Sequence, residues 1–207
     1  MDIKIIAEIG INHDGDADKA MALIKAASNS GVWGVKFQYR NLENAYADDA
    51  KQIGDEMLLT EIRRNYLSPE TILSLTGQAK QLGLAVGISF FDTQDMLDFA
   101  DELASFDFFK VPSVELSNIE LVNSMLRLDK PVYLSLGCHN EAEIDEAISQ
   151  FKGDNWLALH CVSNYPVSLT NARLGYLKHM ANKWQRPFGY SSHDNDWEVT
   201  LIAMSMG

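Results

Sequence analysis

The sequence predicts an α/β protein of the TIM (β/α)8-barrel type, with about seven β/α units present. Short apolar runs alternate with amphipathic stretches from one end of the chain to the other. Most of these runs are apolar on both faces, as expected of parallel strands that are buried on both sides. Polar residues recur near the carboxyl end of every run, which is the rim where a barrel builds its active site.

Each predicted strand is rich in branched and aromatic residues, and a predicted helix follows it. The strands are Ile3–Gly10, Trp33–Gln38, Ala85–Asp92, Phe106–Ser113, Pro131–Gly137, Trp156–Ser163 and Pro187–His193. The helices are Ala17–Ser30, Pro69–Leu82, Thr93–Ala104, Ile119–Leu128, Glu141–Phe151, Asn171–Lys183 and Asp196–Met206. Ser68 before Pro69 is typical of a helix start. Tyr39–Thr60 is the longest irregular stretch, and we expect it to be a functional loop.

An open doubly wound sheet is the competing architecture. Such a sheet would carry a glycine-rich turn after its first strand, but Glu8-Ile9-Gly10-Ile11-Asn12-His13 lacks that pattern. We therefore expect one barrel domain over residues 1–207. A complete (β/α)8 domain runs to about 250 residues. The sequence stops after the seventh helix, so we expect the barrel to be incomplete at its carboxyl end.

Composition excludes several classes of partner. The 207 residues are 46% hydrophobic and carry a net charge of −12. A field of that sign repels nucleic acid and anionic membranes, and no apolar run reaches the roughly 18 residues of a membrane span. Two cysteines, Cys138 and Cys161, make no disulfide framework, which favours a cytoplasmic protein. The expected partners are small molecules, and a homo-oligomer is left open.

Two lysines interrupt apolar strands. Lys36 and Lys110 each lie inside a buried-looking run, where a lysine needs a partner unless its stem leads the charge to solvent. If both face the barrel mouth, they would hold an anion, helped by the hydroxyls of serines at four strand ends: Ser89, Ser113, Ser135 and Ser191. The pattern predicts a phosphate site. Schiff-base formation on Lys110, as in class I aldolases, is an alternative use.

Further rim residues suggest acid–base and ligand roles. Glu8 ends the first strand and Glu115 follows the fourth, so either could contact sugar hydroxyls or act as a general acid or base. His193 ends the last strand and is a candidate ligand of a metal or substrate, although one histidine does not make a metal site. Tyr165, followed by Pro166, is expected to form a rigid loop over the site.

Seven blocks in series resemble the sialic acid synthases, the family of N-acetylneuraminate synthase and related nonulosonic acid synthases. They are Ile6–Gly15, Val35–Gln38, Ile88–Asp92, Phe109–Glu115, Leu134–Gly137, Leu159–Pro166 and Gly189–His193. The first and sixth blocks are the most specific. The resemblance covers essentially the whole chain, in order.

The resemblance implies condensation of phosphoenolpyruvate with an N-acetylated amino sugar of the N-acetylmannosamine type, helped by a divalent metal, Mn2+ or alternatively Mg2+. It implies that phosphoenolpyruvate is held by Lys36, Ser89, Lys110, Ser113, Ser135 and Ser191. It further implies that His193 ligates the metal, that Glu8 and Tyr165 contact the sugar, and that Glu115 transfers a proton near C2. Ser163 stands where the family has asparagine and is kept as a substrate-binding candidate.

The family barrel is followed by a small antifreeze-like domain, and its eighth strand carries a second metal histidine. Neither is in this sequence, so we expect the chain by itself to be inactive or feeble. The alternative to a synthase is a non-catalytic remnant that keeps the phosphate and sugar donors but has lost the metal site.

Overall fold

The computed structural model describes residues 3–42, 55–195 and 197–206. Its contacts divide the chain into two compact units, Lys4–Phe108 and Phe109–Gly207, with the first three residues grouped with the second. We call them the N-terminal and C-terminal units and describe each by itself. Within the described ranges, no helix has the length and apolarity needed to cross a bilayer.

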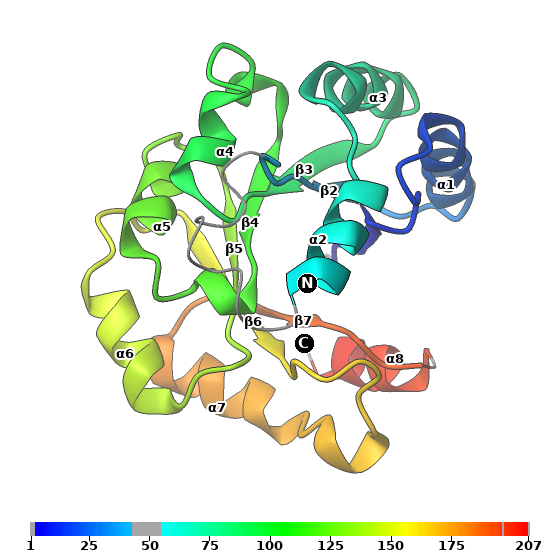
Figure 1. Cartoon of the computed structure of the whole chain (residues 1–207). Coiled ribbons are helices and arrows are strands. Elements are labelled where there is room, and N and C mark those ends of the chain that lie inside the picture. The colour runs from blue at the N-terminus through cyan, green and yellow to red at the C-terminus, as the bar shows by residue number, and fades with distance from the viewer. Residues whose placement is uncertain (1–2, 43–54, 196, 207) are drawn as a thin grey trace. The chain divides into compact units, whose positions relative to one another are not determined.

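The N-terminal unit carries three parallel strands, β1 (Ile6–Gly10), β2 (Gly34–Gln38) and β3 (Ala85–Ser89). Their register pairs Glu8 with Lys36 and Lys36 with Gly87. The helices are α1 (Ala17–Asn29), α2 (Asp55–Arg64), α3 (Pro69–Gln81), α4 (Thr93–Leu97) and the short η1 (Leu103–Ser105). Helices α1 and α3 lie side by side (Figure 1).

The local sequence explains where these helices begin and what they cover. The Asp16 carboxylate accepts from the backbone N–H groups of Asp18 and Lys19 and so caps α1. The Ser68 hydroxyl caps α3 in the same way, ahead of the proline expected there. The unit also contains an aromatic cluster, in which the ring of Phe99 packs 5.5 Å from the ring of Phe90.

The C-terminal unit carries the parallel strands β4 (Phe108–Val111), β5 (Val132–Ser135), β6 (Trp156–Cys161) and β7 (Phe188–Ser191), paired in chain order. Strand β4 begins at the boundary of the two units. The helices are α5 (Ile119–Leu126), α6 (Glu141–Ser149), α7 (Gly175–Trp184) and α8 (Glu198–Ser205), with short turns η2 (Ser113–Glu115) and η3 (Leu169–Asn171).

All seven predicted strands are present in the described residues, and two helix predictions need correction. The stretch Thr93–Ala104 is not one helix, because tighter i→i−3 hydrogen bonds replace the helical ones after Leu97. Helix α2 was not predicted and corrects the end of the predicted loop Tyr39–Thr60, although its apolar residues Leu58 and Ile62 stand at helical spacing. Residues 43–54 of the predicted loop lie outside the described residues.

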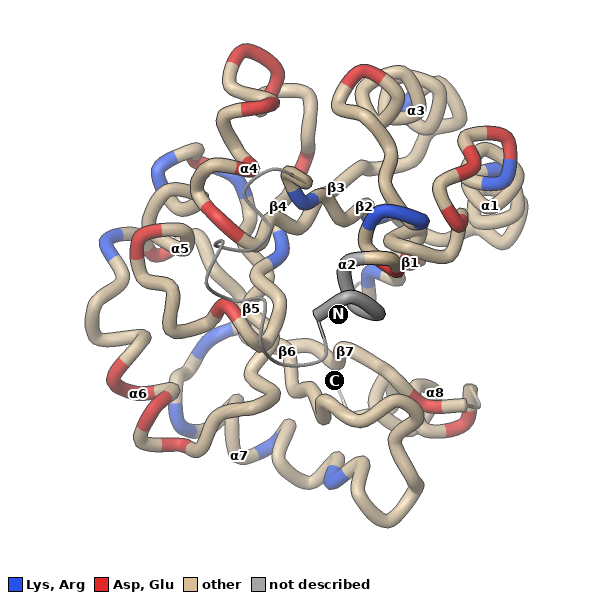
Figure 2. The backbone as a smooth tube through the Cα atoms, viewed as in Figure 1, with Lys and Arg blue, Asp and Glu red and all other residues tan. Residues whose placement is uncertain are grey.

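The acidic surplus sits mainly on helices and connecting loops. Figure 2 shows carboxylates on the loop before α1, on α6 and around α8, whereas the strands carry few. Glu8 is the exception on β1. The negative charge is therefore mostly surface charge, which leaves the strand ends to a small number of polar groups.

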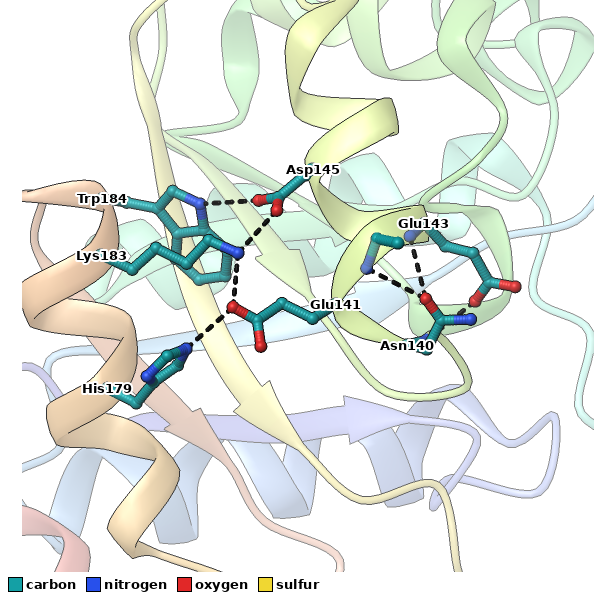
Figure 3. A network of polar contacts seen from close by, with 8 residues as sticks. Asn140, Glu141, Glu143, Asp145, His179, Lys183 and Trp184 are labelled. Atoms are coloured by element: carbon teal, nitrogen blue, oxygen red, sulfur yellow. Dashed lines mark hydrogen bonds and ion pairs between the residues drawn. The ribbon is translucent and has the colours of Figure 1, made fainter.

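A network of polar contacts joins α6 to α7 in the C-terminal unit (Figure 3). The Lys183 ammonium contacts Glu141 and lies 2.6 Å from an oxygen of Asp145. His179 contacts the same Glu141 oxygen at 2.9 Å. The hydrogen bonds from Lys183 and His179 lower the pKa of Glu141, and those to Asp145 and Glu141 raise the pKa of Lys183.

Replacing Lys183 with methionine is expected to lower Tm by no more than a few degrees, because these charges are largely solvated. Because the pKa of Glu141 is lowered in the folded state, this residue contributes to the free energy of unfolding. That contribution is lost as pH falls through the folded-state pKa, which lies below 4.5. The raised pKa of Lys183 gives a second contribution to the free energy of unfolding. It is lost as pH rises through the folded-state pKa of Lys183, which lies above 10.5. Thermal unfolding across pH should therefore separate variant and parent only between those limits, and an equal difference at pH 2 would contradict this account.

Candidate functional site

The first group of predicted site residues lies in the N-terminal unit. The Lys36 ammonium is 2.7 Å from a Glu8 carboxylate oxygen and donates to the Ser89 hydroxyl at 3.1 Å. A weaker contact of 3.4 Å leads to the carbonyl of Phe37. We call Glu8, Lys36 and Ser89 the Lys36 cluster. It places a cation, a carboxylate and a hydroxyl on three adjacent parallel strands.

The register of the strands explains this cluster. Side chains alternate across a strand, so Val35 and Phe37, both fully buried, face away from Lys36. Lys36 is 3% exposed and Ser89 is 1% exposed, whereas the side chain of Glu8 is 40% exposed. A buried ammonium is costly unless it is paired. Lys36 is therefore a fixed positive charge, held by a carboxylate that itself reaches solvent.

The second group lies in the C-terminal unit, around Gly137. A Cβ added to Gly137 would overlap the Ser163 hydroxyl and lie 2.8 Å from the Ser113 hydroxyl. Both hydroxyls therefore point into the space above this glycine, and we call the three residues the Gly137 cluster. Ser113 is buried, and Ser163 is half-buried. The arrangement offers two neutral hydrogen-bond donors to an acceptor oxygen.

Replacing Gly137 with alanine is expected to displace both hydroxyls and weaken phosphoenolpyruvate binding about tenfold, roughly the value of one lost hydrogen bond. Gly137 follows β5 directly and is buried, so circular dichroism must show that the variant keeps its fold. Isothermal titration with phosphoenolpyruvate gives the affinity. The matched control is Gly77→Ala, since an added Cβ there meets nothing within 4 Å. Equal affinities for the two variants would remove the cluster from the site.

Cys161 and His193 form a contact that was not predicted. The Cys161 sulfur is 3.9 Å from His193 Nδ1, and this nitrogen is also 3.1 Å from the carbonyl of Val162. Burial raises the pKa of the Cys161 thiol, but contacts with His193 and Ser113 and the charge of Lys110 outweigh it, so the net shift is downward. The hydrogen bond with Cys161 raises the pKa of His193.

The other ring nitrogen of His193 faces a different partner. Nε2 is 3.2 Å from the Tyr165 hydroxyl, and the two rings stack with centroids 4.1 Å apart. Because the Val162 carbonyl can only accept, Nδ1 is the donor there, which leaves Nε2 with a lone pair in the neutral ring. Nε2 is therefore the ring nitrogen that can act as a ligand, and its present partner is the hydroxyl of the exposed Tyr165 side chain.

The residues present do not make a metal centre by themselves. Among the described residues, no group of three or more His, Cys, Asp or Glu side chains could hold an ion. His193 supplies one imidazole nitrogen. His160 precedes Cys161 on β6, and successive strand residues face opposite sides of the sheet, so His160 points away from the contact between Cys161 and His193. Its Nε2 bonds the carbonyl of Ala172 at 2.7 Å.

The remaining predicted residues are placed as follows. Ser135 ends β5, is fully buried, and its hydroxyl has no hydrogen-bond partner among the described residues. Ser191 ends β7, opposite Cys161 in the register, and is half-buried. Lys110 is half-buried on β4, between two fully buried neighbours. Glu115 lies in η2, where it accepts from the Asn118 side chain at 3.1 Å.

The structure thus brings Glu8, Lys36 and Ser89 together in one unit, and gathers Ser113 and Ser163 around Gly137 in the other. The expected convergence of Lys36 and Lys110 on one mouth stays a prediction. Sequence reasoning missed Cys161 and Gly137. Alternation along β6 was the available signal for Cys161, since His160 and Cys161 must face opposite sides.

Comparison with known proteins identifies the family. Residues 23–207 match the model of the NeuB family. The chain belongs to the NeuB family. N,N'-diacetyllegionaminic acid synthase of Campylobacter jejuni is 31% identical over 98% of this chain. N-acetylneuraminate-9-phosphate synthase of Mus musculus is 27% identical over 98% of it.

The fold of this NeuB-family chain agrees with a solved structure. N-acetylneuraminic acid synthetase of Leptospira borgpetersenii, in complex with citrate, covers the whole chain with a TM-score of 0.90 at 26% identity. The predicted α/β barrel class is confirmed. The chain spans 64% of the Campylobacter relative and 59% of the mouse relative.

Proposed function

We propose that this chain takes part in the condensation of phosphoenolpyruvate with an N-acetylated amino sugar to give a nonulosonic acid, with release of phosphate. Membership of the NeuB family supports this reaction class. The observation that carries the proposal is the Lys36 cluster, because a buried, fixed ammonium beside a hydroxyl suits an anionic substrate.

The proposed reaction forms one carbon–carbon bond. C3 of phosphoenolpyruvate attacks the aldehyde carbon of the open-chain sugar, and the aldehyde oxygen takes up a proton. Water then adds at C2, and inorganic phosphate leaves by cleavage of its C–O bond. No oxidant or reductant is needed, so the demands on the protein are to bind charge, orient the two substrates and move protons.

The proposal gives each group a role. Phosphoenolpyruvate takes its charge partners from Lys36 and Lys110 and its hydroxyl donors from Ser89, Ser113, Ser135, Ser163 and Ser191. Glu8 and Tyr165 contact the sugar. Glu115 moves a proton near C2. The hydroxyl of Ser135 fits such a role, because it is buried and without a partner among the described residues.

His193 is proposed as one ligand of a divalent cation, Mn2+ or Mg2+, through Nε2. Replacing His193 with alanine is expected to weaken Mn2+ binding about tenfold or more, because the change removes the one imidazole ligand that the proposal gives the ion. Electron paramagnetic resonance of free Mn2+ in a titration measures the affinity. The control is His179→Ala, which lies on the surface of α7. Unchanged affinity in the His193 variant would remove it from the metal site.

The function is tested by incubating the chain with phosphoenolpyruvate, N-acetylmannosamine and Mn2+ and following the release of phosphate. Release that depends on the sugar supports the proposal. Omission of the sugar is the control, because it reports simple hydrolysis. Absence of both phosphoenolpyruvate binding and release contradicts the proposal.

A non-catalytic binding remnant is the second candidate. It is favoured by the lack of a group of three metal-binding side chains among the described residues. Tight phosphoenolpyruvate binding without phosphate release would support the remnant. The Schiff-base alternative is tested by borohydride trapping of Lys110 with a keto acid, and the absence of an adduct discards it.

A further inference from the structure

The turn between β1 and α1 closes around a buried histidine, His13. The turn runs from Gly10 to Asp16 in the N-terminal unit, and the structure describes all of its residues. His13 is only 2% exposed. A buried imidazole is costly unless its polar atoms are hydrogen-bonded. The roles proposed above do not use this residue, so its burial calls for an explanation of its own.

Both ring nitrogens of His13 bond to the backbone of the turn. Nδ1 accepts from the N–H of Gly15 at 3.0 Å. Burial lowers the pKa of His13, and a hydrogen bond with the backbone of Gly10 opposes that shift, as a bond donated by the ring to a carbonyl does. Because Nδ1 is the acceptor, the donor to Gly10 is Nε2. The neutral ring therefore links the two ends of the turn.

The same turn holds Glu8. The pairing of β1 with β2 has an irregularity between Glu8 and Gly10. Gly10 has a positive φ of 35°, and a Cβ there would lie 2.5 Å from a Glu8 carboxylate oxygen. The carboxylate therefore lies over Gly10, in space that a glycine leaves free. The backbone carbonyl of Glu8 also accepts from the Asn12 side chain at 3.0 Å. The place of the Glu8 carboxylate thus depends on the conformation of the turn.

The far end of the turn packs against the end of α2. Gly15 has a positive φ of 74°, and a Cβ there would overlap the carbonyl of Arg64. The Arg64 guanidinium lies 3.8 Å from an Asp14 carboxylate oxygen. Gly15 must therefore keep a left-handed conformation in a narrow space. The bond from its N–H to His13 ties that conformation to the end of the turn that carries Glu8.

We propose that His13 is a positioning residue, whose neutral ring bridges Gly10 and Gly15 and so holds the Glu8 carboxylate where it contacts the sugar acceptor. A proton added to Nδ1 turns the acceptor for Gly15 into a donor, and two N–H groups then face each other. The turn loosens, and sugar binding weakens as pH falls. The inference rests on the role of Glu8 in the proposed function and adds the residue that fixes its position.

The surroundings of the ring set the pH at which it gains a proton. Burial is the largest influence and lowers the pKa of His13 from 6.5. The charged groups around the turn are Asp14 and Asp16 on the turn itself, Lys19 on α1, Arg64 on α2 and Glu8 on β1. The carboxylates of the turn raise the pKa of His13, and Lys19 lowers it. His13 is therefore neutral at pH 7 and takes up its proton as pH falls through a folded-state pKa below 6.5.

A packing role alone is the competing explanation for His13. An apolar side chain of similar size would then serve as well, and sugar affinity would not depend on protonation of this ring. His193 in the C-terminal unit also gains a proton as pH falls, and its hydrogen bond with Cys161 raises its pKa. Acid weakening in the parent protein is therefore not enough, and the test compares each variant with the parent at the same pH.

The test measures binding of N-acetylmannosamine by isothermal titration from pH 8 to pH 5, without phosphoenolpyruvate or metal. This sugar has no group that titrates in the range, so any pH dependence comes from the protein. His13→Asn keeps an oxygen that accepts from Gly15 but takes up no proton. We expect it to bind within about threefold of the parent at pH 8, and about threefold or more tighter than the parent at pH 5. His13→Leu should weaken binding about tenfold at pH 8, roughly the value of one lost hydrogen bond.

The matched control is His179→Asn, at an exposed histidine on α7, whose affinity relative to the parent should stay constant across pH. Circular dichroism at each pH must show a folded protein. A His13→Asn variant whose affinity relative to the parent does not change with pH would overturn the inference. A His13→Leu variant that folds and binds as tightly as the parent at pH 8 would overturn it too.

A measurement without ligand separates the inference from the proposed function. The 13C shift of the Glu8 carboxyl is followed by nuclear magnetic resonance in the parent and in His13→Asn. It should move as the His13 ring titrates in the parent and should show no such step in the variant. A Glu8 shift that does not follow the ring would overturn the inference, even if the sugar fails to bind. Failure of phosphate release in the earlier assay sinks the proposed reaction, whereas the role of His13 is decided by these comparisons alone.

Discussion

Replacing Lys36 with methionine is expected to slow any phosphate release by about a hundredfold or more and to weaken phosphoenolpyruvate binding. The side chains have similar length, so the change removes a fixed cation and leaves the packing. Preorganised charges aimed at an anion are worth about 10²–10³ in rate when a single donor is removed. Titration with phosphoenolpyruvate and the phosphate assay measure the two effects.

The fold should survive this substitution. The partner carboxylate, Glu8, is 40% exposed and can be solvated once the ammonium is gone. The control is Lys25→Met, an exposed position on α1. If the Lys36 variant binds phosphoenolpyruvate as tightly as the control does, the Lys36 cluster is a structural ion pair and the proposed function loses its main support.

Replacing Gly87 with alanine is expected to lower the free energy of unfolding by about 3 kcal/mol, the upper part of the range for overpacking a core. An added Cβ would overlap three ring atoms of Phe108. That ring is fully buried and packs 5.3 Å from the ring of Trp33, so it has little space to retreat. Urea denaturation gives the free energy.

The pair of substitutions tests the mechanism. Phe108→Leu should cost stability by itself, but Gly87→Ala combined with Phe108→Leu should be more stable than the sum of the two single changes predicts, because the smaller side chain makes room for the methyl group. Strictly additive losses would show that the alanine acts by some route other than the ring contact. Gly77→Ala again serves as the control, since nothing lies near its Cβ.

Much of the candidate site could be predicted from the sequence, because strand polarity and alternation fix which residues share a rim. Lys36 was predicted as a cation from its place inside an apolar strand and Ser89 as a donor from its place at a strand end, and the structure joins them. The ion pair between Lys36 and Glu8 could not be predicted from the sequence. The contact with Glu8 depends on the register of β1 against β2, and that register includes an irregularity between Glu8 and Gly10.

The sequence by itself determined the order of the strands, their apolar faces and the ends at which polar groups gather, because these follow from local periodicity and composition. The tertiary structure alone decided which of those groups touch. Cys161 meets His193 across 32 residues, and Lys36 meets Ser89 across 53 residues. Contacts of that kind depend on how distant segments pack, which no local pattern encodes.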